Sequence, residues 1–155
     1  MKKFLKTVCF LTALLLMVAS GSGFAKEGIQ TQTHNTLTGI EVDLLSIETR
    51  NNVLTVKFKV RNTGKEKQSM KFNFFDCYVL DEINQKKYFA LKDADGMFIG
   101  GPFYDNDKGG RFWFDIAAGK PMGIWIKFPE PTGQPKSITL SIPDLAPFEE
   151  VSLGK

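Results

Sequence analysis

The chain has 155 residues, of which 43% are hydrophobic and 12% aromatic, and it carries 20 basic residues against 17 acidic ones. The formal net charge of +3 comes entirely from Lys2, Lys3 and Lys6, so the part that follows residue 25 is neutral overall. A neutral domain has no long-range field that would recruit nucleic acid or anionic lipid, and both classes of partner are disfavoured.

The first 25 residues have the layout of a cleavable export signal. Three lysines precede an apolar stretch from Val8 to Ala19, and Gly23-Phe24-Ala25 supplies the small residues of a cleavage point. The apolar stretch holds about a dozen residues, whereas a membrane-spanning helix needs roughly 20. We therefore expect cleavage after Ala25, no stable membrane anchor, and a periplasmic or secreted location.

The mature part is long enough to form one domain whose core needs no disulfide bond or structural metal ion to be stable. It carries a single cysteine, Cys77, so an internal disulfide is excluded. Residues 26–38 are polar and lack a periodic apolar pattern, which is typical of a flexible leader. The folded domain is then expected over residues 39–155.

Beyond Gly39, apolar residues recur with period two in short runs separated by Gly, Pro, Asn and Asp, which indicates antiparallel strands. The clearest run is Val53 to Arg61, where apolar residues alternate with Lys and Arg. In the run from Ile40 to Ile47 the apolar phase shifts near Leu45, which predicts a bulge. The remaining strands are expected at residues 70–80, 88–91, 112–116, 122–128 and 138–142.

The run from Met70 to Leu80 also changes phase, at Phe74-Phe75, and such a strand can bend from one sheet to the other. The tail from Asp144 to Leu153 is expected along the surface, with Leu145 and Phe148 tucked in. About seven strands at this spacing predict an all-β fold, an immunoglobulin-like antiparallel β-sandwich.

Three short motifs add a family resemblance. Val60-Arg61-Asn62-Thr63-Gly64 ends a strong strand, and Leu80-Asp81-Glu82 and Lys86-Lys87-Tyr88 surround a hairpin. This order resembles the secreted immunoglobulin-like modules known as domain of unknown function 4352, and the similarity covers roughly residues 40–153. The resemblance implies the sandwich fold and supplies no catalytic residue, while the segment from Lys92 to Gly110 is longer than the usual connection.

The residues that most often carry out nucleophilic catalysis are poorly placed. His34, the single histidine, falls in the expected leader, and Cys77 alternates with Phe75 and Val79 and is expected to face the core. Without an acid-base or nucleophile set, we expect that the protein is not an enzyme.

The segment from Lys92 to Gly110 could hold a metal ion. Asp93 and Asp95 precede one glycine, Asp105 and Asp107 precede another pair, and alternating aspartates before glycine can place oxygens around Ca²⁺. Asp and Gly are equally the ordinary residues of turns. A Ca²⁺ site and a pair of solvated turns are therefore both open, with turns favoured by the missing distal Glu of a full calcium loop.

Large aromatic residues give the other candidate site. Phe98, Phe103 and Tyr104 lie in the same segment, and Trp113 and Trp125 fall out of phase with the core positions of their strands. An exposed aromatic platform would bind a protein partner or a glycan. Alternatively, the segment folds back as a lid and buries its rings.

These observations favour an exported binding or accessory module, most simply one that engages another cell-envelope protein. A carbohydrate-binding or Ca²⁺-dependent accessory domain is the alternative. The sequence does not indicate the oligomeric state.

Overall fold

The computed structural model describes residues 28–102 and 110–153, which form eleven strands and no helix. Accordingly, none of these residues belongs to a helix that could cross a membrane. Every pairing between the named strands is antiparallel. The all-β antiparallel sandwich predicted from the sequence is confirmed.

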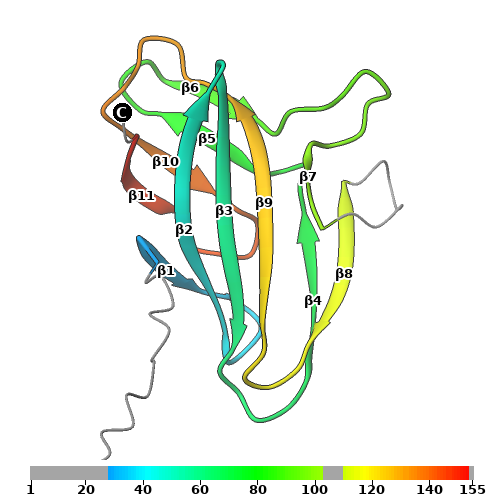
Figure 1. The fold of residues 1–155 in the computed structure, drawn as a ribbon. Helices are drawn as coiled ribbons and strands as arrows, with labels where there is room; N and C mark the ends of the chain where they lie inside the picture. Colours follow the sequence, from blue (N-terminus) through cyan, green and yellow to red (C-terminus); the bar gives the residue numbers. More distant parts are fainter. Residues whose placement is uncertain (1–27, 103–109, 154–155) are drawn as a thin grey trace, which may run out of the picture.

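The larger sheet forms one layer and has the strand order β1-β2-β3-β9-β7 (Figure 1). Its members are β1 (Gln30–Thr33), β2 (Ile40–Arg50), β3 (Val53–Asn62), β9 (Pro121–Pro129) and β7 (Gly100–Gly101).

Two smaller sheets face the larger one. One has the order β11-β10-β5-β6, and the other is the pair β4-β8. Their members are β11 (Phe148–Ser152), β10 (Ser137–Ser141), β5 (Tyr78–Asp81), β6 (Lys86–Phe89), β4 (Gln68–Asn73) and β8 (Arg111–Ile116).

The hairpin of β2 and β3 follows directly from its sequence. Asn51 and Asn52 connect the strands with φ angles of 52° and 61°, which suits the two-residue turn whose central residues are both left-handed. The register shifts between Leu44 and Ser46, so the bulge predicted at Leu45 is confirmed. Past the bulge, Ile47 lies opposite Val56 and joins the core face.

The run from Met70 to Leu80 is not one bent strand as predicted; a turn at the Phe74-Phe75 phase change divides it into two strands that belong to the two smaller sheets. β4 ends at Asn73, whose Oδ1 accepts a hydrogen bond from the Phe75 amide at 3.0 Å, and β5 begins at Tyr78. Cys77 and Val79 are buried, whereas Phe75 is 40% exposed because it lies in the turn itself.

The expected flexible leader is wrong for residues 28–38. β1 pairs with Glu41–Leu44 of β2, and the amide of His34 donates to the carbonyl of Ile40 at 2.9 Å. The polar composition misled because β1 is an edge strand whose Gln and Thr side chains bond to the rest of the domain. Gln30 Nε2 and Gln32 Nε2 donate to the carbonyls of Glu149 and Pro147 at 2.6 and 2.8 Å.

Eleven strands replace the seven expected, for four identifiable reasons. The 70–80 run divides into β4 and β5, the leader supplies β1, the long connection supplies the two-residue β7, and the tail supplies β11. In the tail Leu145 and Phe148 are buried as predicted, and Val151 is buried as well.

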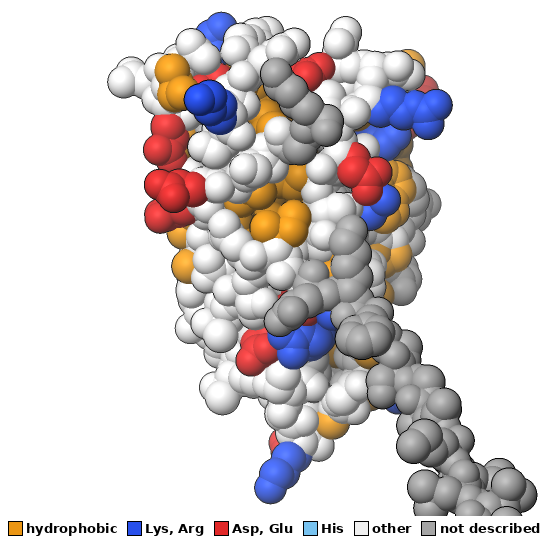
Figure 2. All heavy atoms as spheres, turned by 60° about the vertical axis from the view of Figure 1, so that its left-hand side comes forward, with side chains coloured by type: hydrophobic (Ala, Val, Ile, Leu, Met, Phe, Trp, Pro, Cys, Tyr) orange, Lys and Arg blue, Asp and Glu red, His pale blue; other side chains and the backbone are white. Residues whose placement is uncertain are grey.

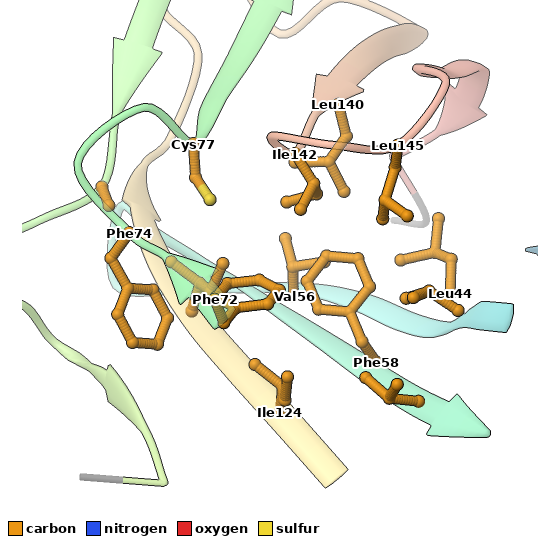
Figure 3. Close-up of a cluster of buried hydrophobic side chains, with 14 of the residues drawn as sticks. Leu44, Val56, Phe58, Phe72, Phe74, Cys77, Ile124, Leu140, Ile142 and Leu145 are labelled. Carbon is orange, nitrogen blue, oxygen red and sulfur yellow. The ribbon is translucent and has the colours of Figure 1, made fainter. Parts of the chain in front are cut away.

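The core lies between the layers and is dominated by phenylalanine. Figure 3 shows Val56, Phe58 and Ile124 of the larger sheet facing Phe72 and Leu140 of the smaller sheets. Phe58 and Phe148 join the layers with ring centroids 5.9 Å apart. The apolar alternation read from β3, β8 and β9 is thereby confirmed, since Leu54, Val56, Phe58, Val60, Phe112, Phe114, Ile116, Ile124, Ile126 and Phe128 are all buried.

Candidate binding surface

Phe98 belongs to the core and not to an exposed platform. Its side chain is 4% exposed, and its ring centroid lies 6.4 Å from that of Phe74 and 4.9 Å from that of Phe75. Lys92 crosses above the same ring, with Nζ 4.5 Å from the centroid. Phe98 therefore follows the alternative expectation, in which the segment folds back and buries its rings. The prediction that Phe98 contacts a ligand directly is wrong.

Trp125 is partly buried on the outward side of β9. It lies opposite Gly101 of β7, and a Cβ at Gly101 would collide with the indole Nε1. The absence of a side chain at Gly101 therefore lets β7 pass close over the ring. Trp125 is covered in part by backbone, which leaves less of it for a partner than the strand phase suggested.

Phe103 and Tyr104, together with Asp105 and Asp107, lie outside the described residues. The predictions made for these four residues stay predictions.

Asp93 and Asp95 are exposed and lie in a tight turn. The Oδ1 atom of Asp93 accepts hydrogen bonds from the amides of Asp95 and Met97, at 3.0 and 2.8 Å. The Asp93 amide in turn donates to the Met97 carbonyl at 2.9 Å. One carboxylate oxygen is thus used to close the turn, and over residues 28–102 and 110–153 no group of three His, Cys, Asp or Glu side chains is placed to hold a metal ion.

Trp113 is exposed, as the strand phase predicted. It lies in β8 between Phe112 and Phe114, which point into the core, and alternation turns its indole outward with 51% of the residue accessible. Lys71 lies directly opposite on β4, with Nζ 5.5 Å from the centre of the indole. The amine of Lys71 lies against the Trp113 indole, and the core contacts of Phe112 and Phe114 fix the backbone of β8 on both sides of it.

A hollow of about 390 Å³ adjoins the indole. Its lining combines the edge of the core with polar groups of the outer face: Ser69, Trp113, Phe114, Asp115 and Met122. Ser69 and Asp115 are opposite each other in the β4-β8 pair, and Met122 comes from β9. We call Trp113 and this hollow, with Ser69, Lys71 and Asp115, the Trp113 surface.

Asp115 gives the Trp113 surface a negative group. Lys67 Nζ is 2.8 Å from its Oδ2, and this ion pair, with a further contribution from Ser69, holds the pKa of Asp115 below its usual value. The carboxylate is therefore ionised at neutral pH and can accept hydrogen bonds from a ligand. The surface offers an aromatic face, a carboxylate and a hydroxyl within one region.

The two residues considered for catalysis are occupied by structural roles. His34 Nδ1 accepts hydrogen bonds from the amides of Thr36 and Leu37, each at 3.2 Å. The Cys77 thiol is fully buried, which raises its pKa, and Sγ donates to the carbonyl of Asn73 at 3.0 Å. Neither group is among the residues that line the hollow beside Trp113.

Sequence reasoning found Trp113 but missed its neighbours. Ser69, Lys71 and Asp115 surround the indole only because β4 pairs with β8 in one register, Lys71 opposite Trp113. Some 40 residues separate the two strands in the chain, so no local pattern reports that register. The alternation of apolar and polar residues in β8 was the single available indication. It showed that Trp113 faces outward, but it did not show which polar residues lie around the indole.

Comparisons with known proteins add one distant structural likeness. No family model and no curated protein matches the chain. A crystal structure of the yjhA protein from Bacillus subtilis superposes with a TM-score of 0.47 and 13% sequence identity, covering 76% of this chain and 79% of that one. At this level the comparison transfers no site residue, and the resemblance to domain of unknown function 4352 stays a prediction.

Proposed function

We propose that the protein is an exported, non-enzymatic module that binds another cell-envelope protein through the Trp113 surface. The observation that carries the proposal is the 51% exposure of a tryptophan beside a hollow, on a strand whose flanking residues are fully used in the core. An exposed aromatic ring forgoes the hydrophobic stabilisation that it would have if buried. Exposed aromatic rings are enriched at sites where proteins bind partners.

The rigidity of the strand supports this role. Phe112 stacks on Phe114 with ring centroids 5.1 Å apart, and Phe72 lies 5.6 Å from Phe112 on the neighbouring strand. These contacts fix the backbone on both sides of Trp113. A ligand would therefore meet a preorganised indole, and little conformational entropy would be lost on binding.

A glycan is the second candidate ligand. The indole face can stack on a sugar ring, while the carboxylate of Asp115 and the hydroxyl of Ser69 can hydrogen-bond to sugar hydroxyl groups. The lining of the hollow by all three groups favours this alternative specifically.

The test compares Trp113→Ala with Phe89→Ala, which removes another exposed ring from β6, where 54% of the residue is accessible. Each purified variant is used to capture proteins from envelope extract, with identification by mass spectrometry, and is applied to a polysaccharide array. We expect Trp113→Ala alone to lose its ligand, with both melting temperatures close to that of the wild type, because surface substitutions rarely change stability much.

Capture of the same protein by both variants would contradict the proposal. Loss of array binding in Trp113→Ala, with no captured protein for the wild type, would replace the protein partner by a glycan.

A further inference from the structure

Three connections meet at one end of the sandwich, far from the Trp113 surface. They are the turn between β2 and β3, the hairpin of β5 and β6, and the connection from β9 to β10 (Figure 1). Met122, near the start of β9, lines the hollow beside Trp113, whereas Glu130 follows the end of the same strand. An extended strand of this length separates the two regions by about 25 Å, so this end is a separate surface.

A second hollow of about 390 Å³ lies between the β2–β3 turn and the β9–β10 connection, and we call it the Asn52 hollow. Its lining consists of Asn52, Glu130, Pro131, Thr132, Gly133 and Gln134. Pro131 is the one apolar side chain among them and is itself buried. Sites for small molecules start at about 300 Å³, and those that take apolar molecules are lined mainly by hydrophobic side chains. The volume therefore admits a small ligand, and the lining requires a polar one.

Hydrogen bonds hold the wall of the Asn52 hollow in place. The Glu130 amide donates to the Asn52 carbonyl at 2.9 Å, which joins the connection to the β2–β3 turn. The Thr132 amide donates to Tyr88 Oη of β6, also at 2.9 Å, and the two hydroxyl groups lie 3.0 Å apart. Because these bonds fix the connection at two points, a ligand would need little reordering of the wall on binding.

Three side chains of the lining have polar groups that the protein does not use. Within residues 28–102 and 110–153, the carboxamides of Asn52 and Gln134 and the carboxylate of Glu130 form no hydrogen bond or ion pair. Asn52 and Gln134 have φ angles of 61° and 47°, in the region that glycine adopts most easily and a long side chain such as glutamine seldom adopts. Residues kept in such conformations are common at ligand-binding positions.

The Asn52 hollow has no one-sided charge. Glu130 supplies a carboxylate, and the amine of Lys86 lies at the edge of the hollow, 3.4 Å from Thr132 Oγ1. In Figure 2 the same end of the molecule is uppermost, and most atoms there belong to the backbone or to uncharged polar side chains, with charged side chains scattered among them. An ionic ligand would gain little from this mixture of signs, whereas carboxamide groups both donate and accept hydrogen bonds.

We infer that the Asn52 hollow binds a neutral sugar unit of a glycan. The hydroxyl groups of a sugar also donate and accept, so they match the free groups of Asn52, Gln134 and Glu130, while Pro131 would contact the carbon atoms of the sugar ring. The inference does not depend on the protein partner proposed for the Trp113 surface. It gives the module a second ligand of a different chemical class, at the other end of the domain.

Two other occupants fit the Asn52 hollow less well. A Ca²⁺ ion takes six to eight oxygen ligands, several of them carboxylates, and Glu130 is the single carboxylate of the lining. An extended peptide needs a groove or a sheet edge along its length, whereas this lining is confined to Asn52 and residues 130–134.

The experiment applies the purified protein to an array of neutral, acidic and amino oligosaccharides and then titrates the neutral oligosaccharide that binds most tightly, by calorimetry. The test variant combines Asn52→Gly with Gln134→Gly, which removes both carboxamides and leaves backbone angles that suit glycine. We expect the affinity to fall about tenfold or more, because two hydrogen bonds are lost. Glu130→Gln, which keeps the shape of the side chain, should weaken binding several-fold.

The matched control combines Asn51→Gly with Gln85→Gly. It changes the same two residue types, both exposed and at φ angles of 52° and 51°, but neither residue lines the hollow. We expect unchanged affinity in the control and similar melting temperatures for the two double variants, which separates loss of the ligand from loss of the fold.

Binding of no neutral oligosaccharide, a preference for acidic or amino oligosaccharides, or equal losses of affinity in the two double variants would overturn the inference. Trp113→Ala should leave the titrated affinity unchanged even if that variant loses its protein partner. Loss of oligosaccharide binding in Trp113→Ala, with binding retained in Asn52→Gly with Gln134→Gly, would overturn the inference and assign the glycan to the Trp113 surface.

Discussion

Phe58 lies at the centre of the core and allows the strand phase to be tested at one residue. It is 1% exposed and contacts Phe148 across the layers. Phe58→Ala removes the ring and leaves a cavity, so we expect the free energy of unfolding to fall by about 3–5 kcal/mol. Urea unfolding followed by tryptophan fluorescence measures the loss.

The control for this substitution is Lys57→Ala, the next residue on the opposite face. Its ion pair with Glu48 is exposed on both sides, so almost no change in midpoint is expected. Lys59 is a poorer control because its amine contacts the buried carboxylate of Asp43 at 3.2 Å. Equal midpoints for Phe58→Ala and Lys57→Ala would reverse the assignment of faces.

His34 makes a pH dependence testable. Burial lowers its pKa below the ordinary 6.5, partly opposed by nearby Asp144, and protonation of Nδ1 would break the bonds from Thr36 and Leu37. Because the folded pKa is depressed, the stabilisation is fully present above the unfolded value of 6.5. It is lost as pH falls from there through the folded pKa.

We therefore expect the urea midpoint of the wild type to decrease between about pH 7.5 and about pH 5, and that of His34→Gln to change less over the same interval. Parallel pH profiles for the two proteins would show that His34 does not titrate with unfolding.

At the scale of elements, Asp43 joins β1, β2 and β3 on the outer side of the larger sheet. Its carboxylate accepts two bonds from Arg61, at 2.7 and 2.8 Å, and one from Thr31 at 2.8 Å. The Arg61 bonds are the main cause that lowers its pKa from 3.8 to about 2. The resulting stabilisation is complete above pH 3.8 and is lost as pH falls toward 2.

Asp43→Asn keeps the shape of the side chain but removes the charge facing Arg61 and Lys59. We expect a loss of about 1–3 kcal/mol at neutral pH, with faster amide exchange in β1, because Lys59 loses its carboxylate partner and Arg61 keeps only its ion pair with Glu41. Asp115→Asn, in the exposed pair with Lys67, is the matched control and should not change the midpoint measurably. Similar losses in the two variants would contradict a special role for the buried network.

The long connection from Lys92 to Gly110 contributes both to the core and to the larger sheet. Its first part closes a turn through Asp93, buries Phe98, and then adds β7 to the larger sheet. Gly110 follows, and a Cβ there would collide with the ring of Phe75. In the sequence Gly101 and Gly110 looked like ordinary loop glycines. In the structure an aromatic ring packs directly against the backbone at each of them, Trp125 at Gly101 and Phe75 at Gly110.

For the whole molecule, the sequence was sufficient to predict what depends on local alternation. The apolar phases of β3, β8 and β9 and the bulge at Leu45 follow from neighbouring residues, and all are confirmed. Trp113 was identified for the same reason. The phase change at Phe74-Phe75 was also visible, but it marks a turn between two strands and not a bend within one.

Contacts between distant segments could not be predicted in this way. β1 and β11 have polar or mixed sequences and become strands only because the domain offers each of them an edge. Asp43 sits at an outward position of β2, yet it is 3% exposed because Arg61, Lys59 and Thr31 surround it. The polar frame of Trp113 depends likewise on the register of β4 and β8.

The bonds that join β1 to the end of the chain impose an order on folding. Gln30 is bonded to a carbonyl 119 residues further on, and the amide of Asn35 donates to the carbonyl of Asp144 at 2.9 Å. On the ribosome β1 is synthesised long before the groups near β11 that complete its hydrogen bonding. Contacts of such high sequence separation slow folding, and the nascent chain cannot close this side of the sandwich before β11 has been synthesised.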